Sequence, residues 1–204
     1  TNKILSQLDE INAKSRVQIP ISELTVALQC GGSDSYSGIT SNPALGIASD
    51  MIVDNGGSTI LAETTEIYGA EHLLFERSVN KENIIKIEKQ IEWWKEYLSK
   101  NNSVLDNNPS PGNKKGGLTT ILEKSLGAVA KSGSRNMVDV LDYAEKLKIR
   151  GFNFMNSPGY DPVSVTGQVA SGANVICFTT GRGSCFGFKP TPSIKISSNT
   201  NMYN

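Results

Sequence analysis

Two carboxylates and a histidine lie close together in the sequence, at Glu63, Glu66 and His72. Carboxylate and imidazole groups are suitable ligands for a divalent iron or manganese ion. His72 is the only histidine of the chain, and it is the default group to exchange a proton near neutral pH. This spacing predicts a metal or acid–base site. The alternative is that His72 is a packed or surface residue on a helix, which is the more common role of a lone histidine.

Two cations in glycine-rich segments are further candidates. Arg182, between Gly181 and Gly183, suits a two-point grip on a carboxylate, with a surface arginine in a turn as the alternative. Lys115 lies in residues 112–116, which lack the spacing and the Ser/Thr of a phosphate-binding P-loop. It is a candidate anion ligand or base, and a solvated loop charge is the alternative.

Short apolar runs and helical periodicity alternate along the chain. Strands are predicted at residues 24–29, 58–62, 151–156 and 174–179, and helices at residues 2–13, 42–55, 81–100, 119–130, 137–147 and 161–170. Strand–helix–strand order is typical of a parallel sheet. We therefore expect an α/β fold, with a Rossmann-like three-layer arrangement around a mainly parallel sheet in residues 21–204. Residues 1–20 are interpreted as a helical tail of a preceding segment.

Polar residues follow each of the four predicted strands. These strand-end segments are residues 30–34, 63–66, 157–161 and 179–183, and all are rich in hydroxyl, carboxylate or glycine residues. Ligands of open parallel sheets bind beyond the carboxyl ends of the strands. The four segments are therefore predicted to share one site. Residues 101–117 are the least regular stretch, and they are interpreted as a linker or an ordered binding loop. Trp93 and Trp94 are interpreted as packing residues rather than a sugar platform.

Composition narrows the possible partners and the compartment. Twenty basic and twenty acidic residues cancel, so neither nucleic acid nor an anionic membrane is an expected partner. The three cysteines do not form a disulfide pattern, and the chain shows neither a signal peptide nor a membrane-length apolar run. A cytoplasmic location is the expectation.

Four segments resemble the altronate/galactarate dehydratase family. They are CGGSDSYSGITSNPALG (30–46), AETTEIYGAEHLL (62–74), NPSPGNKKGGLTTILEKSLGAVAKSG (108–133) and FTTGRGS (178–184). A fifth, SPGYDPVSVTGQVASG (157–172), is more similar to the altronate branch. The resemblance implies a hydro-lyase that converts altronate to 2-keto-3-deoxygluconate with a divalent metal, Fe²⁺ or Mn²⁺, on a Rossmann-like sheet. It also implies a small N-terminal domain and a C-terminal continuation that this sequence does not include, so that the catalytic domain is expected to be truncated at its C-terminal end.

The resemblance also suggests roles for particular residues. Glu66, His72 and Lys115 are the expected catalytic groups, and Cys30 joins Glu63, Glu66 and His72 as an expected metal ligand, with a small packed thiol as the alternative. The expected substrate-binding residues are Ser33, Asp34, Thr179, Thr180 and Arg182.

Several readings of the function remain open on the sequence. Galactarate dehydration and the loss of sulfite from sulfolactate are alternatives within the family, and a non-catalytic sugar-acid binding module is the alternative from another class. The expected partner is a small sugar acid, and a homodimer is compatible with the sequence.

Overall fold

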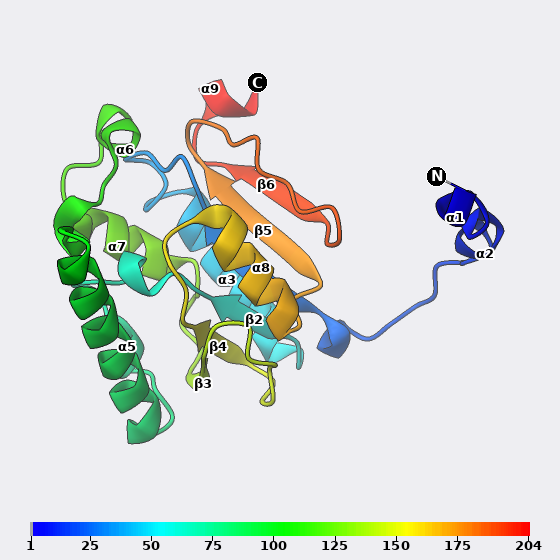
Figure 1. The fold of residues 1–204 in the computed structure, drawn as a ribbon, viewed down its shortest axis with the longest axis horizontal. Helices are drawn as coiled ribbons and strands as arrows, with labels where there is room; N and C mark the ends of the chain where they lie inside the picture. Colours follow the sequence, from blue (N-terminus) through cyan, green and yellow to red (C-terminus); the bar gives the residue numbers. More distant parts are fainter. Residues whose placement is uncertain (1) are drawn as a thin grey trace.

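The computed structural model describes residues 2–204, which are built around a six-stranded, all-parallel sheet with the strand order β3-β4-β2-β1-β5-β6 (Figure 1). The strands are β1 (Thr25–Cys30), β2 (Ser58–Leu61), β3 (Met137–Leu141), β4 (Phe152–Met155), β5 (Val175–Thr180) and β6 (Ser193–Ser197). The predicted α/β fold with a parallel sheet is therefore confirmed.

Helices cover both faces of the sheet. They are α3 (Ser41–Asp54), α5 (Lys81–Lys100), α7 (Ile121–Ala130) and α8 (Asp161–Ser171). Side chains of α3, α5 and α7 pack on one face with Val26 and Leu28 of β1, and Val165 of α8 packs on the other face with Ala27. Successive residues of a strand point to opposite faces, so this split gives three layers. Figure 1 shows α8 alone in front of the sheet.

Local capping explains where two of these helices begin. The Asn80 side chain accepts a hydrogen bond from the Asn83 amide at 2.8 Å and caps α5. The Thr120 hydroxyl does the same for α7 through the Glu123 amide at 3.2 Å. Such caps satisfy amides that have no partner inside the helix. Both helices begin within two residues of the predicted positions.

The predicted helix at residues 137–147 is wrong, because this segment begins as strand β3. Residues 137, 139, 140 and 141 pair in parallel with β4, and Met137, Val140 and Leu141 are buried. The spacing of these apolar residues fits a helical face as well as a strand. Pairing with β4 determines that the segment is a strand. The chain turns away at Asp142, and residues 142–151 form the connection to β4.

Two segments with weak sequence signals are ordered. Residues 101–117 contain the 3₁₀ helix Leu105–Asn107, a cis peptide bond before Pro109, and the helix α6 (Pro111–Lys115). Residues 189–204, for which no element was predicted, contain the edge strand β6 and the helix α9 (Thr200–Tyr203). The stretch at 101–117 is therefore an ordered loop, and it folds over the carboxyl end of the sheet.

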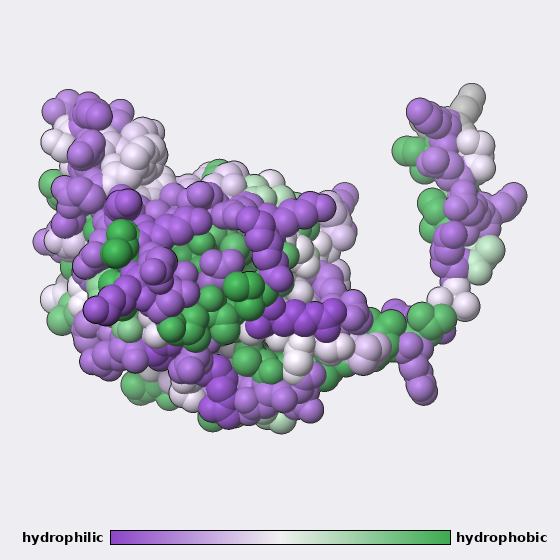
Figure 2. All heavy atoms as spheres, turned by 90° about the horizontal axis from the view of Figure 1, so that it is seen from below, coloured by the Kyte–Doolittle hydropathy of each residue, from purple (hydrophilic) through white to green (hydrophobic). Residues whose placement is uncertain are grey.

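The N-terminal segment stands away from the body (Figures 1 and 2). It forms α1 (Asn2–Leu5) and α2 (Leu8–Asn12) in place of the single predicted helix, and every residue from 3 to 20 is exposed. The apolar side chains of this arm include Ile4, Leu5 and Ile11. Residues 2–204 contain no helix with both the length and the apolar character that a bilayer crossing requires.

Candidate active site

A buried cluster of ionisable groups lies at the carboxyl edge of the sheet. We call Cys30, Glu63, Glu66, Lys124 and Lys131 the buried polar cluster. Cys30 ends β1, the two glutamates follow β2, and the two lysines belong to α7 and its C-terminal cap. Parallel strands bring their carboxyl ends to one edge, and α7 packs on the same side, so residues far apart in sequence meet here.

Lys131 and Cys30 form one pair of this cluster. The Lys131 ammonium group donates to Cys30 Sγ at 2.8 Å, and the lysine side chain is fully buried. Burial alone favours the neutral amine, but the nearby Cys30, Glu63 and Glu66 raise the pKa of Lys131, so it remains protonated. Burial raises the pKa of the Cys30 thiol, and the charge of Lys131 opposes that effect.

Lys124 and Glu66 form the second pair, a buried ion pair in direct contact. Although burial disfavours its charge, the Lys124 ammonium group holds the pKa of Glu66 below its usual value. Glu66 in turn raises the pKa of Lys124 despite burial. The Asn108 side chain also donates to Glu66 at 3.4 Å, and Glu66 Oε2 lies 3.8 Å from Cys30 Sγ. The two pairs are therefore electrostatically linked.

Glu63 is the carboxyl of the cluster whose pKa is raised. Burial and the neighbouring Glu66 raise its pKa well above the usual value. Its Oε1 accepts a hydrogen bond from Gln29 at 2.8 Å, and its amide donates to Ser157 Oγ at 3.0 Å. Its backbone is left-handed, with φ 75° and ψ 71°, which is costly for a residue with a Cβ. The hydrogen bonds to Gln29 of β1 and to Ser157, which follows β4, hold Glu63 in this conformation.

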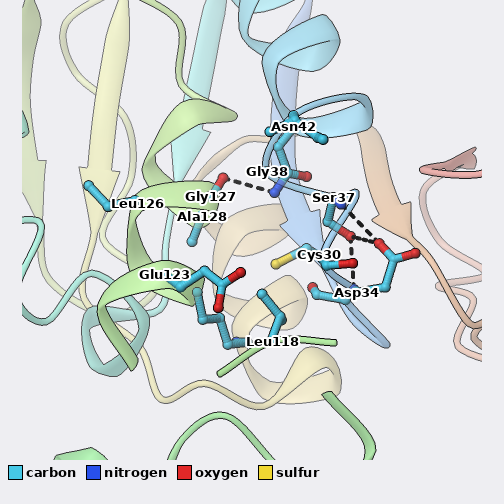
Figure 3. A pocket seen from close by; sticks show the side chains of 14 residues that line it. Cys30, Asp34, Ser37, Gly38, Asn42, Leu118, Glu123, Leu126, Gly127 and Ala128 are labelled. Carbon is cyan, nitrogen blue, oxygen red and sulfur yellow. Dashed lines mark hydrogen bonds between the residues drawn. The ribbon is translucent and has the colours of Figure 1, made fainter. Parts of the chain in front are cut away.

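An open cavity of about 450 Å³ gives access to the cluster. Cys30, Glu66 and Lys124 line it, together with Asp161 at the start of α8 and Asn108. Burial raises the pKa of Asp161, with Gln29 acting in the opposite direction through a 3.2 Å hydrogen bond. A second hollow of about 240 Å³ lies between the 30–34 turn and α7, and it also reaches Cys30 and Lys124 (Figure 3).

The cluster includes donors that suit a transition metal. Ligand atoms of Cys30, Glu63 and Glu66 all lie within 4.8 Å of one another. One thiol and two carboxylates fit Fe²⁺ or Mn²⁺ in kind. A bound ion would compete with the Lys131 and Lys124 ammonium groups, which already contact Cys30 and Glu66.

The structure separates several residues that were expected to act together. His72, at the start of the short helix α4 (His72–Phe75), is exposed and lies outside the metal-donor group. Lys115 is exposed on α6, and it lines a different hollow with Arg182, which is also exposed. Neither cation lines the 450 Å³ cavity. Of the eight residues expected to be catalytic or substrate-binding, Glu66 and Ser33 line this cavity.

Three of the expected substrate-binding residues, Asp34, Thr179 and Thr180, do not line the 450 Å³ cavity. The Asp34 carboxylate accepts bonds from Ser37, Ser198 and Asn199, which lower its pKa against the opposing effect of burial. Asp34 thus ties the 30–34 turn to the segment after β6. Thr179 donates to Asn42 at 2.6 Å, and the buried Thr180 hydroxyl has no hydrogen-bond partner among residues 2–204.

Lys124, Lys131 and Asn108 were not singled out as site residues from the sequence, and Asp161 was included only as the last residue of the strand-end segment 157–161. Residues 121, 124, 125 and 128 share one face of α7, so Lys124 lies among small and apolar residues on the buried side. A lysine on the apolar face of an amphipathic helix is the signal that could have singled it out. Lys131 lies just beyond the helix, where periodicity gives no such signal.

Known proteins are similar in sequence to this chain. Residues 21–204 match the family described as D-galactarate/altronate dehydratase, C-terminal. The chain is 46% identical over 189 residues to an altronate dehydratase of Bacillus subtilis strain 168, covering 92% of this chain and 38% of that protein. It is 44% identical over 197 residues to a galactarate dehydratase (L-threo-forming) of Escherichia coli K12, covering 97% and 38%.

A relative with another activity is more distant. The chain is 37% identical over 182 residues to a (2R)-sulfolactate sulfo-lyase subunit beta of Chromohalobacter salexigens, covering 88% of this chain and 47% of that subunit. The chain thus spans less than half the length of each of these relatives. Because the family match extends over 21–204, which includes the whole sheet and the buried polar cluster, the chain belongs to the D-galactarate/altronate dehydratase C-terminal family.

Proposed function

We propose that this domain contains the active site of a sugar-acid dehydratase, and that altronate is its substrate. The observation behind the proposal is the Lys124–Glu66 ion pair, which lines a cavity at the carboxyl edge of the sheet opposite Asp161. A buried cation and a carboxylate of raised pKa are what an α-proton abstraction next to a carboxylate requires. Family membership supports the reaction class.

Lys124 is the proposed anchor for the substrate carboxylate. Its ammonium group lines the cavity and stays charged, because Glu66 holds it against the effect of burial. When the α-proton leaves, negative charge builds up on the carboxylate as an ene-diolate. A fixed cation in a site of low dielectric stabilises this charge strongly. Glu66 and Asn108 act as positioning residues for Lys124.

Asp161 is the proposed proton acceptor. Its pKa is raised by burial, which makes it a stronger base than an exposed aspartate. Asp161 takes the proton from C2 and passes it to the C3 hydroxyl, which departs as water. The resulting enol then gives its hydroxyl proton to Asp161, which delivers a proton to C3. The product is a 2-keto-3-deoxy acid, Asp161 returns to its starting state, and Lys124 remains a cation throughout.

We also propose that Cys30, Glu63 and Glu66 hold Fe²⁺ or Mn²⁺. A divalent ion there would supply additional positive charge beside the substrate carboxylate. The proposed ligand set omits His72, which is exposed and is not part of the donor group. Cys30 is kept at the cluster by Lys131, so ion binding requires this contact to open.

A substrate panel tests the proposed function. The intact protein is incubated separately with altronate, galactarate and sulfolactate, and the keto product and sulfite are measured. We expect the highest kcat/KM with altronate. Galactarate is the second candidate, because the identity to the galactarate dehydratase is only slightly lower, at 44% against 46%. Thermal stabilisation by altronate without any product would instead identify a sugar-acid binding module.

A further inference from the structure

Both tryptophans of the chain line a second cavity, outside the buried polar cluster. It has a volume of about 510 Å³ and lies between α5 and the start of α8. Trp93, Trp94, Pro158 and Val163 give it apolar walls, and Lys89 and Gln90 are among its polar residues. A volume of a few hundred cubic ångströms is sufficient for a compact small molecule.

Trp93 gives this cavity a flat, accessible wall. Its side chain is 53% exposed, and its ring stacks on Tyr97 with a centroid distance of 5.2 Å and an interplanar angle of 9°. Trp94 meets Trp93 edge-on at 4.9 Å, and its Nε1 donates to Asn156 Oδ1 at 2.9 Å. The interpretation of both residues as packing groups thus holds for the half-buried Trp94 and not for Trp93. Aromatic stacking and the edge-on contact fix the wall before any ligand arrives.

Gln90 is the polar group that this cavity leaves unsatisfied. The side chain is 6% exposed, and its Oε1 has no hydrogen-bond partner among residues 2–204. Its Nε2 makes only long contacts of 3.4 Å, to the Leu141 carbonyl and to Asp142. A buried amide oxygen without a donor is costly. The last torsion of a glutamine is soft, so a small rotation turns Oε1 toward a ligand in the cavity.

The charged side chains that line the cavity indicate what charge a ligand would carry. Lys86 lies within 3.4 Å of Asp142 and Glu145, whereas Lys89 has no ion-pair partner in the part of the chain that the structure describes. We propose that this cavity binds a small aromatic acid whose ring carries a hydroxyl group. The ring packs against Trp93, the hydroxyl donates to Gln90 Oε1, and the carboxylate pairs with Lys89. A polyhydroxy acid fits less well, because the walls are largely apolar.

Tryptophan fluorescence tests this proposal, because the only two tryptophans both line the cavity. The intact protein is titrated with 4-hydroxyphenylacetate and with phenylacetate, which lacks the hydroxyl. We expect saturable changes in emission, with the hydroxylated acid binding about tenfold more tightly, as one hydrogen bond allows. In Gln90→Met the two acids should bind equally, and Lys81→Met, an exposed change at the start of α5, should behave as the parent.

Three results would overturn the proposal. They are emission that changes without saturation, an unchanged affinity ratio in Gln90→Met, and tighter binding of altronate than of 4-hydroxyphenylacetate. Binding is read without turnover, so these results are independent of the proposed dehydration. Lys89→Met provides a second check, because it should weaken the binding of both acids by a similar factor.

Discussion

Two lysines buried beside two glutamates and a thiol are the central feature at the residue scale. Buried charges are costly unless they are paired, and here each ammonium group has a specific partner, Lys124 with Glu66 and Lys131 with Cys30. The pairing explains why both lysines remain cations although burial favours their neutral forms. Such perturbed groups at the wall of a cavity are typical of an active site.

The Lys124–Glu66 pair makes a prediction for stability. Lys124→Met leaves Glu66 buried without its counter-charge, and we expect the free energy of unfolding to fall by about 3–5 kcal/mol. In the double variant Lys124→Met/Glu66→Gln no charge is stranded, so stability should recover in part. Urea unfolding of the parent, both single variants and the double variant measures the coupling. Purely additive losses would contradict the assigned pair.

The proposed ligand set makes a prediction for metal binding. Cys30→Ser removes the thiol donor, and we expect binding of Fe²⁺ or Mn²⁺ to weaken by at least about 10- to 100-fold, because the loss of a group that only orients a ligand already has that effect. His72→Ala should bind the ion like the parent, because His72 is exposed and outside the donor group. Anaerobic titration followed by calorimetry measures both. Loss of binding in His72→Ala alone would restore the ligand set expected from the sequence.

The sequence predicted that the candidate site lies at the ends of the strands, but it did not predict all of the residues that form it. Cys30, Glu63 and Glu66 follow apolar strands, and this pattern is visible in the sequence. Lys124 and Lys131 come from a helix about 60 residues further on, and only the packing of α7 on the same face brings them to the strand ends. His72 and Lys115 were predicted as site residues from their side-chain chemistry and from the motifs that contain them. Neither property indicates whether a side chain is buried, and both residues are exposed.

At the element scale, the packing of α3 against α7 positions both lysines. Gly46 of α3 lies against the last turn of α7, where a Cβ on Gly46 would lie 2.3 Å from the Ala130 carbonyl oxygen. That carbonyl immediately precedes Lys131, so the contact sets how closely the two helices approach. Strand β3 gives a second example, since its neighbour β4 decides that residues 137–141 are extended.

Gly46→Ala tests this helix contact. Replacing glycine by alanine inside a helix normally raises the free energy of unfolding by up to about 1 kcal/mol. Here the clash with backbone should outweigh that gain, and we expect the free energy of unfolding to fall by about 1–3 kcal/mol. Gly187→Ala is the matched control, because a Cβ there meets nothing within 4 Å. Equal stability of the two variants in chemical unfolding would show that the approach of α3 and α7 is looser than described.

The turn after β3 makes a prediction for pH dependence. Hydrogen bonds from Lys148 and the Asp142 amide, with a smaller contribution from Lys86, lower the pKa of Glu145 to about 2. A lowered folded-state pKa stabilises the fold above the unfolded value, about 4.3, and this contribution is lost as the pH falls from there toward 2. Glu145→Gln should therefore be less stable than the parent at pH 7, by less than about 1 kcal/mol because the group is partly exposed.

The difference between Glu145→Gln and the parent should shrink as the pH falls from 5 to 3. Urea midpoints at pH 7, 5 and 3 measure it, with the exposed Glu88→Gln as the control. A difference that grows at acidic pH would have the wrong sign for this assignment.

At the scale of the whole molecule, the strand order explains the composite site. β1 and β2 are neighbours in the middle of the sheet, flanked by β5 and β4. The segments that follow β1, β2 and β4 line the 450 Å³ cavity, whereas Gly181 and Arg182, which follow β5, line a different hollow, so three of the four segments predicted to share one site do so. The sequence predicted these four strands, and they were enough to locate the site. It did not predict the edge strand β6, because a short run of half-exposed residues has little periodic signal. It assigned the residues of the other edge strand, β3, to a helix, because their apolar spacing fits a helical face as well as a strand.

The N-terminal arm makes a prediction at this scale as well. Residues 3–20 are all exposed, so deleting residues 1–19 removes little packing from the sheet and its helices. We expect the midpoint of thermal unfolding to change by less than about 2 °C, since a loss below about 0.5 kcal/mol shifts it little. A drop of 10 °C in calorimetry would show that the arm contributes to the stability of the body.

The central claim is that Asp161 and the buried polar cluster form the catalytic site. The most direct measurement is kcat for altronate in the intact protein with Asp161→Asn and, as the control, with Asp54→Asn, which lies beside Arg135 at the opposite edge of the sheet. We predict at least about a 100-fold fall in kcat for Asp161→Asn, the usual effect of removing a general base, and no more than a twofold change for Asp54→Asn. Turnover at the parental rate by Asp161→Asn would contradict the account.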